Sequence, residues 1–172
     1  QCTDQLAILS EDGHFKYIAS LVESFLGYTE EDLLKITIFD LAQPDDVVHL
    51  SKVLNRTVGN TDLATDSYTA RLRHKNGKWH WFKMTFTNKC NDPLILGIVA
   101  KFWDITDQKV AEDQILQLNR LYAFTSQINK AITHAKNEQS LLEHVCQIAI
   151  KIGKFKAAWI GIFDSDTGNM DV

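Results

Sequence analysis

The residues that could carry catalysis or bind a metal are spread along this chain without the spacing that such chemistry requires. Cys2, Cys90 and Cys146 form no CxxC pair, so neither a zinc site nor a disulfide framework is expected. The histidines lack metal-ligand spacing as well: His74, His80, His134 and His144. Acidic residues gather at turns and helix starts, where capping and dipole interactions account for them. The sequence therefore predicts no catalytic residue, no metal site and no enzyme in this fragment.

The composition is that of a folded, slightly acidic protein of 172 residues with a formal net charge of -4. Nucleic-acid binding is not expected, because it needs a concentrated cationic face. The apolar runs at 94–100 and 157–163 are far shorter than the roughly 20 residues of a membrane helix. The N-terminus lacks signal-peptide features, so we expect the chain to start inside a longer parent protein. Its unpaired cysteines favour a cytoplasmic location, and the parent itself could be membrane-anchored.

The elements that would position any site begin with two strands and several short helices. Residues 5–9 and 15–18 are apolar runs on either side of a turn signal. A short helix is expected at 20–26, and residues 29–32 read as a capping box in which Asp replaces the usual Glu. Pro44 with two acids opens a further helix, whose apolar positions follow helical spacing to residue 58.

Three more strands are expected, at residues 67–74, 79–87 and 95–104. The loop between the first two contains Asn76 and Gly77, and its length fixes the register. A three-residue loop with Gly77 in the left-handed conformation pairs Ala70 with Phe82 and Tyr68 with Met84. This register keeps charged side chains off the core face.

The register divides the sheet into an apolar inner face and a mixed outer face. The outer face places Arg71 opposite Trp81 and Arg73 opposite Trp79, so that cations lie over aromatic rings. Lys83, Lys101 and Trp103 share that face. The inner face, directed toward the helices, carries the following residues: Tyr68, Ala70, Leu72, Phe82, Met84, Phe86, Ile98, Ala100 and Phe102.

A long helix follows the last strand and has an apolar seam. Residues 107–135 contain neither Gly nor Pro, and a heptad repeat places apolar residues along one side, with Gln114 and Thr125 weakening it. Its a positions are Ala111, Leu118, Thr125 and Ile132, and its d positions are Gln114, Leu121, Ile128 and Ala135. A second helix is expected at 138–152 and a buried strand at 157–163.

Four segments in this order resemble a PAS domain, with its closing Asp-Ile-Thr motif. They are Ser10-Glu11-Asp12-Gly13, the stretch from Phe25 to Leu33, the hairpin from Arg73 to Trp79, and Trp103-Asp104-Ile105-Thr106-Asp107-Gln108-Lys109. The resemblance assigns residues 1–106 to a PAS sensor domain. It implies an α+β fold with a five-stranded antiparallel sheet and short helices on one face, as the strand order also predicts.

The rest of the chain resembles the start of a GAF domain. The residues that carry this likeness lie at 118–122, 126–132 and 155–161. We therefore expect a signalling helix at 107–135, which is a coiled-coil linker and the first helix of GAF, and a truncated GAF domain at 136–172, a helix-strand segment. In the family, such tandem sensors precede a histidine kinase or a cyclic-di-GMP diguanylate cyclase or phosphodiesterase module.

The resemblance places a ligand pocket between the inner face of the sheet and the helix that ends at residue 58. A filled core without ligand is the equally weighted alternative, and an unknown small ligand is left open. Tyr68 is the best polar probe, because a buried phenol normally finds a partner. The candidate lining is Phe39, Val48, Leu50, Leu54, Tyr68, Leu72, Met84, Ile98 and Ala100.

Cofactor binding is the main alternative, and no cofactor is predicted. His49 lies where haem-binding relatives place an axial ligand, but its neighbours do not match that pattern. Flavin-binding light sensors use a cysteine where this chain has residues 38–41, Ile-Phe-Asp-Leu. Cys90 is expected in a polar loop, where an exposed thiol is more often incidental than a redox switch.

Asp104, Ile105 and Thr106 stand where the last strand meets the long helix, and we expect them to relay the signal. Thr106 or Asp107 can cap the helix, and in the family the Asp ties the strand end to backbone or to a basic residue. A simple helix cap is the plainer interpretation.

The predicted function is sensory input, dimerisation and relay in a bacterial signal-transduction protein. A haem or flavin sensor for redox state, gas or light is one alternative, and a fragment of an enzyme whose catalytic part is missing is another. The expected partners are a second copy of the chain, through the long helix, and the downstream output domain of the parent. The candidate docking residues are Trp81, Trp103, Leu118, Leu121 and Ile128.

Overall fold

The computed structural model describes residues 5–19, 25–60, 67–135, 137–163 and 170–171. The chain divides into two compact units, residues 1–109 and 110–172. No helix within the described ranges is both long and apolar enough to cross a membrane.

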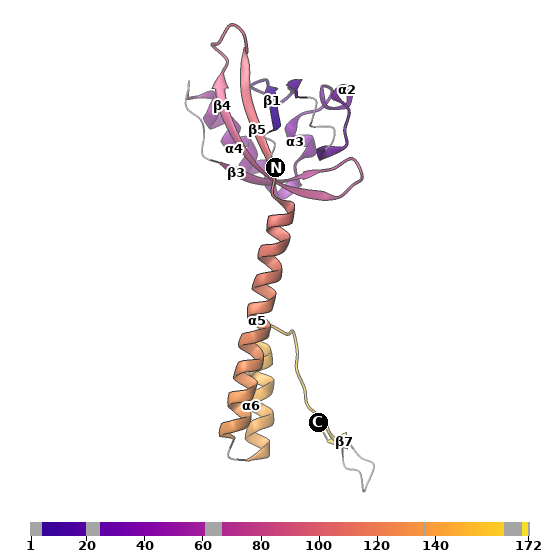
Figure 1. The fold of residues 1–172 in the computed structure, drawn as a ribbon, viewed down its shortest axis with the longest axis vertical. Coiled ribbons are helices and arrows are strands. Elements are labelled where there is room, and N and C mark those ends of the chain that lie inside the picture. The colour runs from indigo at the N-terminus through magenta and orange to yellow at the C-terminus, as the bar shows by residue number, and fades with distance from the viewer. Residues whose placement is uncertain (1–4, 20–24, 61–66, 136, 164–169, 172) are drawn as a thin grey trace. The chain divides into compact units, whose positions relative to one another are not determined.

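The first unit is built on a five-stranded antiparallel sheet (Figure 1). The strands are β1 (Gln5–Leu9), β2 (Phe15–Ile18), β3 (Tyr68–Arg73), β4 (Trp79–Lys89) and β5 (Gly97–Asp104), in the spatial order β2-β1-β5-β4-β3. The predicted α+β fold with this sheet is confirmed. β5 starts two residues later than expected because the chain turns just before it, where Leu96 has a φ of 46°.

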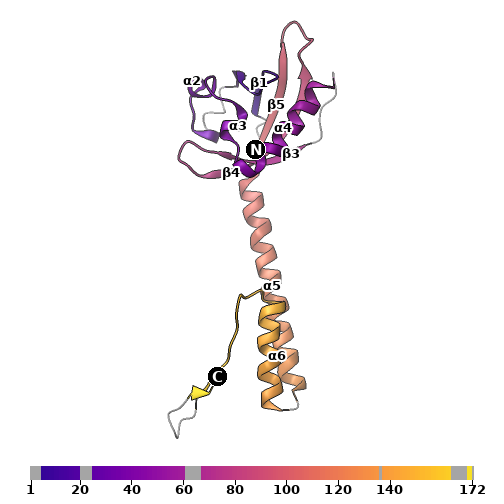
Figure 2. The ribbon, with the colours of Figure 1, turned by 180° about the vertical axis from the view of Figure 1, so that it is seen from behind.

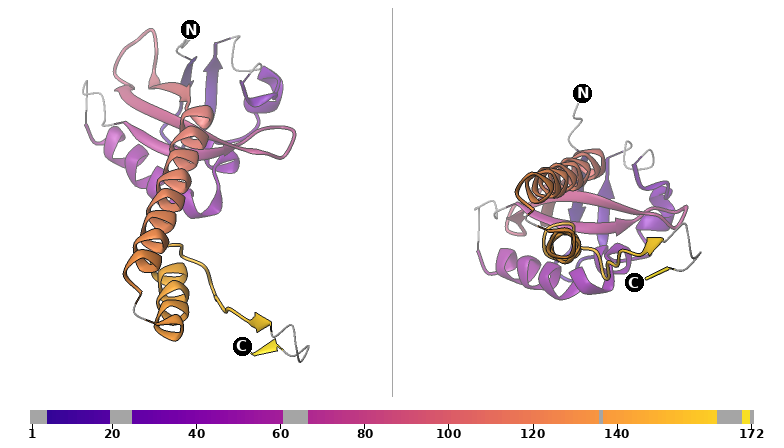
Figure 3. Two further views of the ribbon diagram at one scale, coloured as in Figure 1. Left: turned by 60° about the horizontal axis from the view of Figure 1, so that its bottom comes forward. Right: turned by 90° about the horizontal axis from the view of Figure 1, so that it is seen from below.

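Helices cover one face of the sheet, among them α2 (Glu30–Leu33), α3 (Ile38–Leu41) and the longer α4 (Pro44–Val58). Figure 2 shows α3 and α4 in front of the strands, and Figure 3 shows α4 as a layer beside them. The capping box of α2, Thr29 with Asp32, was predicted and is confirmed. α3 begins with a second one, Thr37 with Asp40. Phe25 and Leu26 are helical, and the rest of the helix expected at 20–26 lies outside the described residues.

The hairpin between β3 and β4 has the predicted register. Gly77 adopts a φ of 87°, in the left-handed region that glycine enters without steric cost. Ala70 pairs with Phe82 and Tyr68 with Met84. One face of both strands therefore points toward the helices.

The core lies between this inner face and the helices. Eight of the nine predicted inner-face residues are buried, and Tyr68 is partly buried. On the outer face, the guanidinium carbon of Arg71 lies 5.1 Å from the centre of the Trp81 ring, as the register predicted. Trp79, opposite Arg73, is 41% exposed.

The second unit consists mainly of two helices. α5 (Thr106–His134) begins at the end of the first unit and has no buried residue, and α6 (Glu138–Lys151) runs back beside its second half (Figures 1 and 2). The Phe124 and Phe155 rings meet edge to face at 5.6 Å.

The strand expected at 157–163 is wrong for most of its length. Only β6 (Ile162–Phe163) is a strand, and it pairs with β7 (Met170–Asp171). An apolar run becomes a strand only where a neighbour completes its backbone hydrogen bonds. Among the described residues, β7 provides such a neighbour for these two residues alone.

Candidate functional site

A group of hydrogen bonds joins the sheet of the first unit to the start of α5. Trp81, the third residue of β4, donates its backbone N–H to Thr106 Oγ1 at 2.9 Å. Its carbonyl oxygen accepts the N–H of Ile105 at 2.8 Å. The Ile105 carbonyl in turn accepts from Lys109 N–H, the first bond of the helix. The start of α5 is thus fixed to β4 by two hydrogen bonds to one residue.

Asp104 completes this junction from the end of β5. Its Oδ1 accepts the Thr106 N–H at 2.8 Å, and its Oδ2 lies 3.1 Å from His80 Nδ1. Burial raises the pKa of this carboxyl, but the hydrogen bonds from Thr106 and the contact with His80 outweigh burial and lower it overall. Thr106 or Asp107 was expected to cap the helix. Thr106 instead uses its side chain to bind β4, and Asp104 accepts the N–H at the helix start.

His80 belongs to a pair of stacked histidines that the sequence analysis did not single out. The His74 and His80 rings lie 5.3 Å apart with an interplanar angle of 24°. A Cβ atom at Gly27 would come within 2.7 Å of the His74 ring, so that glycine leaves room for it. The alternation of β4 could have indicated a role for His80. Its side chain points to the same side as buried Phe82, where a polar group needs a hydrogen-bond partner.

A second polar cluster connects α4 with β3 and β4. Arg71 donates from Nε and Nη2 to the two carboxylate oxygens of Asp46, each at 2.9 Å, while its backbone N–H donates to Asp46 Oδ2 at 3.0 Å. The Arg71 side-chain bonds are the main cause of the lowered pKa of Asp46. Because Arg71 also lies over Trp81, this cluster contacts the residue that holds the start of α5.

The structure places the predicted pocket residues mostly in a packed core. Leu50, Leu54, Leu72, Met84, Ile98 and Ala100 are each at most 1% exposed, and Phe39 packs against them. Tyr68 donates its hydroxyl hydrogen to the Asp46 carbonyl at 3.3 Å, and its pKa is raised, mainly by burial and then by Asp46. Val48 is 57% exposed, so its assignment to the lining is wrong: it points to the solvent side of α4, because Leu50 and Leu54 occupy the core side.

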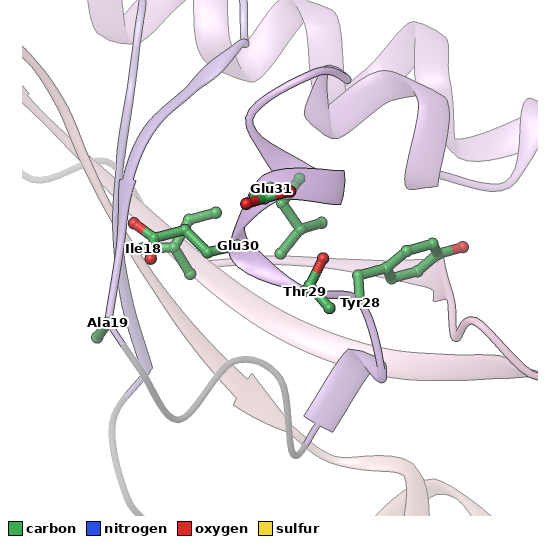
Figure 4. Close-up of a pocket in the computed structure, with 7 residues that line it drawn as sticks. Ile18, Ala19, Tyr28, Thr29, Glu30 and Glu31 are labelled. Atoms are coloured by element: carbon green, nitrogen blue, oxygen red, sulfur yellow. The ribbon is translucent and has the colours of Figure 1, made fainter.

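Other cavities in the first unit differ from the predicted one. An interior cavity of about 10 Å³ lies among Ala7, Phe15, Leu26 and their neighbours, and it holds at most one water molecule. A surface pocket of about 380 Å³ lies between β2 and α2, with Glu30 and Glu31 in its lining (Figure 4). Neither was predicted from the sequence.

The remaining candidates lie at the surface. Leu118 and Leu121 are about half exposed, at 51% and 50%, and Ile128 is partly buried. Trp81 and Trp103 are partly buried on the outer face of the sheet, and His49 is exposed. Burial, followed by the nearby Glu11, raises the pKa of the Cys90 thiol, which disfavours its reactive thiolate form. Among the described residues no three metal-binding side chains come together.

Comparison with known proteins agrees with this fold. Residues 15–92 match the family model of the PAS fold. The PAS domain of a protein from Colwellia psychrerythraea superposes with a TM-score of 0.53 at 20% identity, over 60% of this chain and 87% of that one. The N-terminal unit is a PAS domain.

Two further proteins are similar to this PAS domain. The White collar 2 protein of Neurospora crassa is 30% identical over 76 residues, which make up 44% of this chain and only 14% of that protein. A domain of the sensory box sensor histidine kinase/response regulator from Geobacter sulfurreducens superposes with a TM-score of 0.47 at 19% identity, over 58% of this chain and 81% of that one.

Proposed function

We propose that this chain is the sensory input, dimerisation and relay module of a bacterial signal-transduction protein. The observation that carries the proposal is the pair of hydrogen bonds at Trp81, whose N–H donates to Thr106 Oγ1 and whose carbonyl accepts the Ile105 N–H. A shift of β4 within the PAS sheet must move the start of α5 or break these bonds. Asp104, Ile105 and Thr106 are then the relay residues.

The input reaches the junction from the core. A small ligand among the candidate pocket residues would displace α4 or β4, and the cluster of Asp46, Arg71 and Trp81 would transmit the displacement. Because those candidate residues are closely packed, binding would require the core to open. No cofactor is part of the proposal.

In this proposal the signal leaves the PAS domain along α5. In the proposal, two copies pair through the seam of the helix at Leu118, Leu121 and Ile128, while Trp81 and Trp103 provide a docking surface on the sheet. Residues 136–172 are the beginning of a GAF domain, and the parent is a cytoplasmic or membrane-anchored histidine kinase or cyclic-di-GMP enzyme. The absence of any buried residue in α5 supports this pairing, since its apolar side chains gain by burial in a partner.

Sedimentation at two protein concentrations tests the pairing. We expect the wild-type chain to dimerise and Leu118→Glu to sediment as a monomer, because a charge in the seam would be buried without a partner. Leu116→Glu is the matched control: Leu116 is 65% exposed and lies outside the seam, so this variant should still dimerise. A wild-type chain that remains monomeric at every concentration contradicts the proposal.

Absorption and native mass of the freshly purified chain test the input. A small bound ligand would add mass without a visible absorption band. A visible band would instead favour the haem or flavin alternative and contradict the cofactor-free proposal.

A further inference from the structure

The carboxylate of Asp104 contacts both His80 and the start of α5. The Nδ1 atom of His80 is 3.1 Å from Asp104 Oδ2, and Asp104 Oδ1 accepts the Thr106 N–H at 2.8 Å. The side chains of His80 and Asp104 are 26% and 21% exposed, so solvent screens their interaction only partly. A change in the charge of His80 therefore acts directly on the carboxylate that binds the helix.

The two stacked histidines respond differently to a proton. The Asn76 N–H donates to His74 Nδ1 at 3.0 Å, which requires a lone pair there and hence a neutral His74. His80 uses its Nδ1–H toward Asp104, so its second proton goes to Nε2 and creates a cation beside the carboxylate. Protonating His74 as well would break its bond to Asn76 and place two cationic rings 5.3 Å apart. The pair favours a single added proton, on His80.

The charges around the pair support this assignment. From β5, Asp104 contacts His80 directly. From the hairpin, the Lys75 ammonium is held by Asp32 of α2 at 2.7 Å, and Lys78 and Arg73 are exposed. On the side of the loop before α2, the neighbour is Gly27, which has no charge. Asp104 is thus the carboxylate placed to stabilise a charged His80.

We propose that His80 is a proton sensor: its protonation strengthens its bond to Asp104 and changes the Asp104–Thr106 bond at the start of α5. This inference rests on the proposed relay through α5. It adds protons as an input that acts at the junction rather than in the core. Asp104 remains ionised at neutral and mildly acidic pH, because its pKa is lowered from 3.8.

Nuclear magnetic resonance of the ¹⁵N-labelled full chain tests the proposal through the Thr106 amide. We expect its resonance to move with a single midpoint as the pH falls from about 8 to about 5. His80→Gln should abolish the movement. His14→Gln is the matched control, because His14 also pairs with a carboxylate, Asp12 at 3.0 Å, but is exposed and lies in the turn between β1 and β2.

A Thr106 resonance that does not titrate in the wild type, or that titrates unchanged in His80→Gln, overturns the proposal. If His80→Gln loses the dispersed amide spectrum of a folded chain, Asp104→Asn takes its place and should also abolish the response. A monomer in the sedimentation experiment would contradict the relay by dimerisation while leaving the Thr106 titration unaffected, so the two failures can be told apart.

Discussion

At the scale of single residues, the junction shows how a polar pair is accommodated at the edge of an apolar core. His80 and Asp104 follow the alternation of their strands and point to the inner side, next to Phe82 and Phe102. Leaving either without a partner there would cost about 1–3 kcal/mol. The two side chains instead form a hydrogen bond with each other, and the second carboxylate oxygen of Asp104 accepts the Thr106 N–H at the helix start.

Asp104→Asn should lower the free energy of unfolding at pH 7 by about 1–3 kcal/mol, because hydrogen bonds to a charged acceptor are lost. The folded-state pKa of Asp104 is below 3.8, so its charge stabilises the fold above about pH 4 and this contribution disappears as the pH falls through the folded-state pKa.

Urea unfolding at pH 7 and at about pH 2.5 measures this difference. The gap between wild type and variant should shrink at the lower pH. Asp113→Asn, on the exposed side of α5, is the control and should change little. An equal gap at both pH values would mean that the charge of Asp104 is not what stabilises the junction.

At the scale of elements, the start of α4 covers the free edge of the sheet. β3 is an edge strand, and its unpaired backbone groups could recruit another chain. Here the Arg71 N–H donates to Asp46 and the Arg71 carbonyl accepts from Gln43 N–H at 2.9 Å. The same carboxylate binds the guanidinium, so Asp46 contacts this edge through both the backbone and the side chain of Arg71 and fixes the start of α4 there.

A double-mutant cycle with Arg71→Met and Asp46→Asn should give a coupling energy of about 1–3 kcal/mol from urea unfolding, because the bond is bidentate and the side chains are only 28% and 17% exposed. The control cycle on Lys75 and Asp32, whose side chains are 52% and 40% exposed, should give a clearly smaller value. Equal couplings would show that the edge contact has no special strength.

At the scale of the whole molecule, burial is distributed unevenly between the two units. The main apolar cluster belongs entirely to the first unit. In the second, the buried apolar side chains among the described residues are Ile148 and Ala149, while Trp159 is 69% exposed. Exposed apolar side chains of this size are typical of surfaces that another chain or segment covers.

Hydrogen exchange on the intact chain should reflect this distribution. Amides of β4 and β5 should exchange only through global unfolding, whereas amides of α6 should exchange faster through local opening, because few buried contacts oppose it. Exchange is measured amide by amide, with the exposed turn at Asn76 as the fast reference. Equal protection in α6 and β5 would contradict this prediction.

The sequence by itself determined the features that depend on near neighbours along the chain. Alternation and Gly77 together specify the register of β3 and β4, because a slip of one residue would turn charged side chains into the core. The spacing of Thr29 and Asp32 specifies the start of α2 in the same local way. The change from the alternating pattern of the last strand to a helical pattern also places Asp104 to Thr106 where β5 ends and α5 begins.

Only the tertiary structure decided which distant residues meet. His80 and Asp104 are 24 positions apart, and Asp46 and Arg71 are 25 apart, so no local pattern brings them together. Val48 faces solvent and β6 is short for the same reason: the side of a helix that is buried, and the length of a strand, depend on the elements packed beside them.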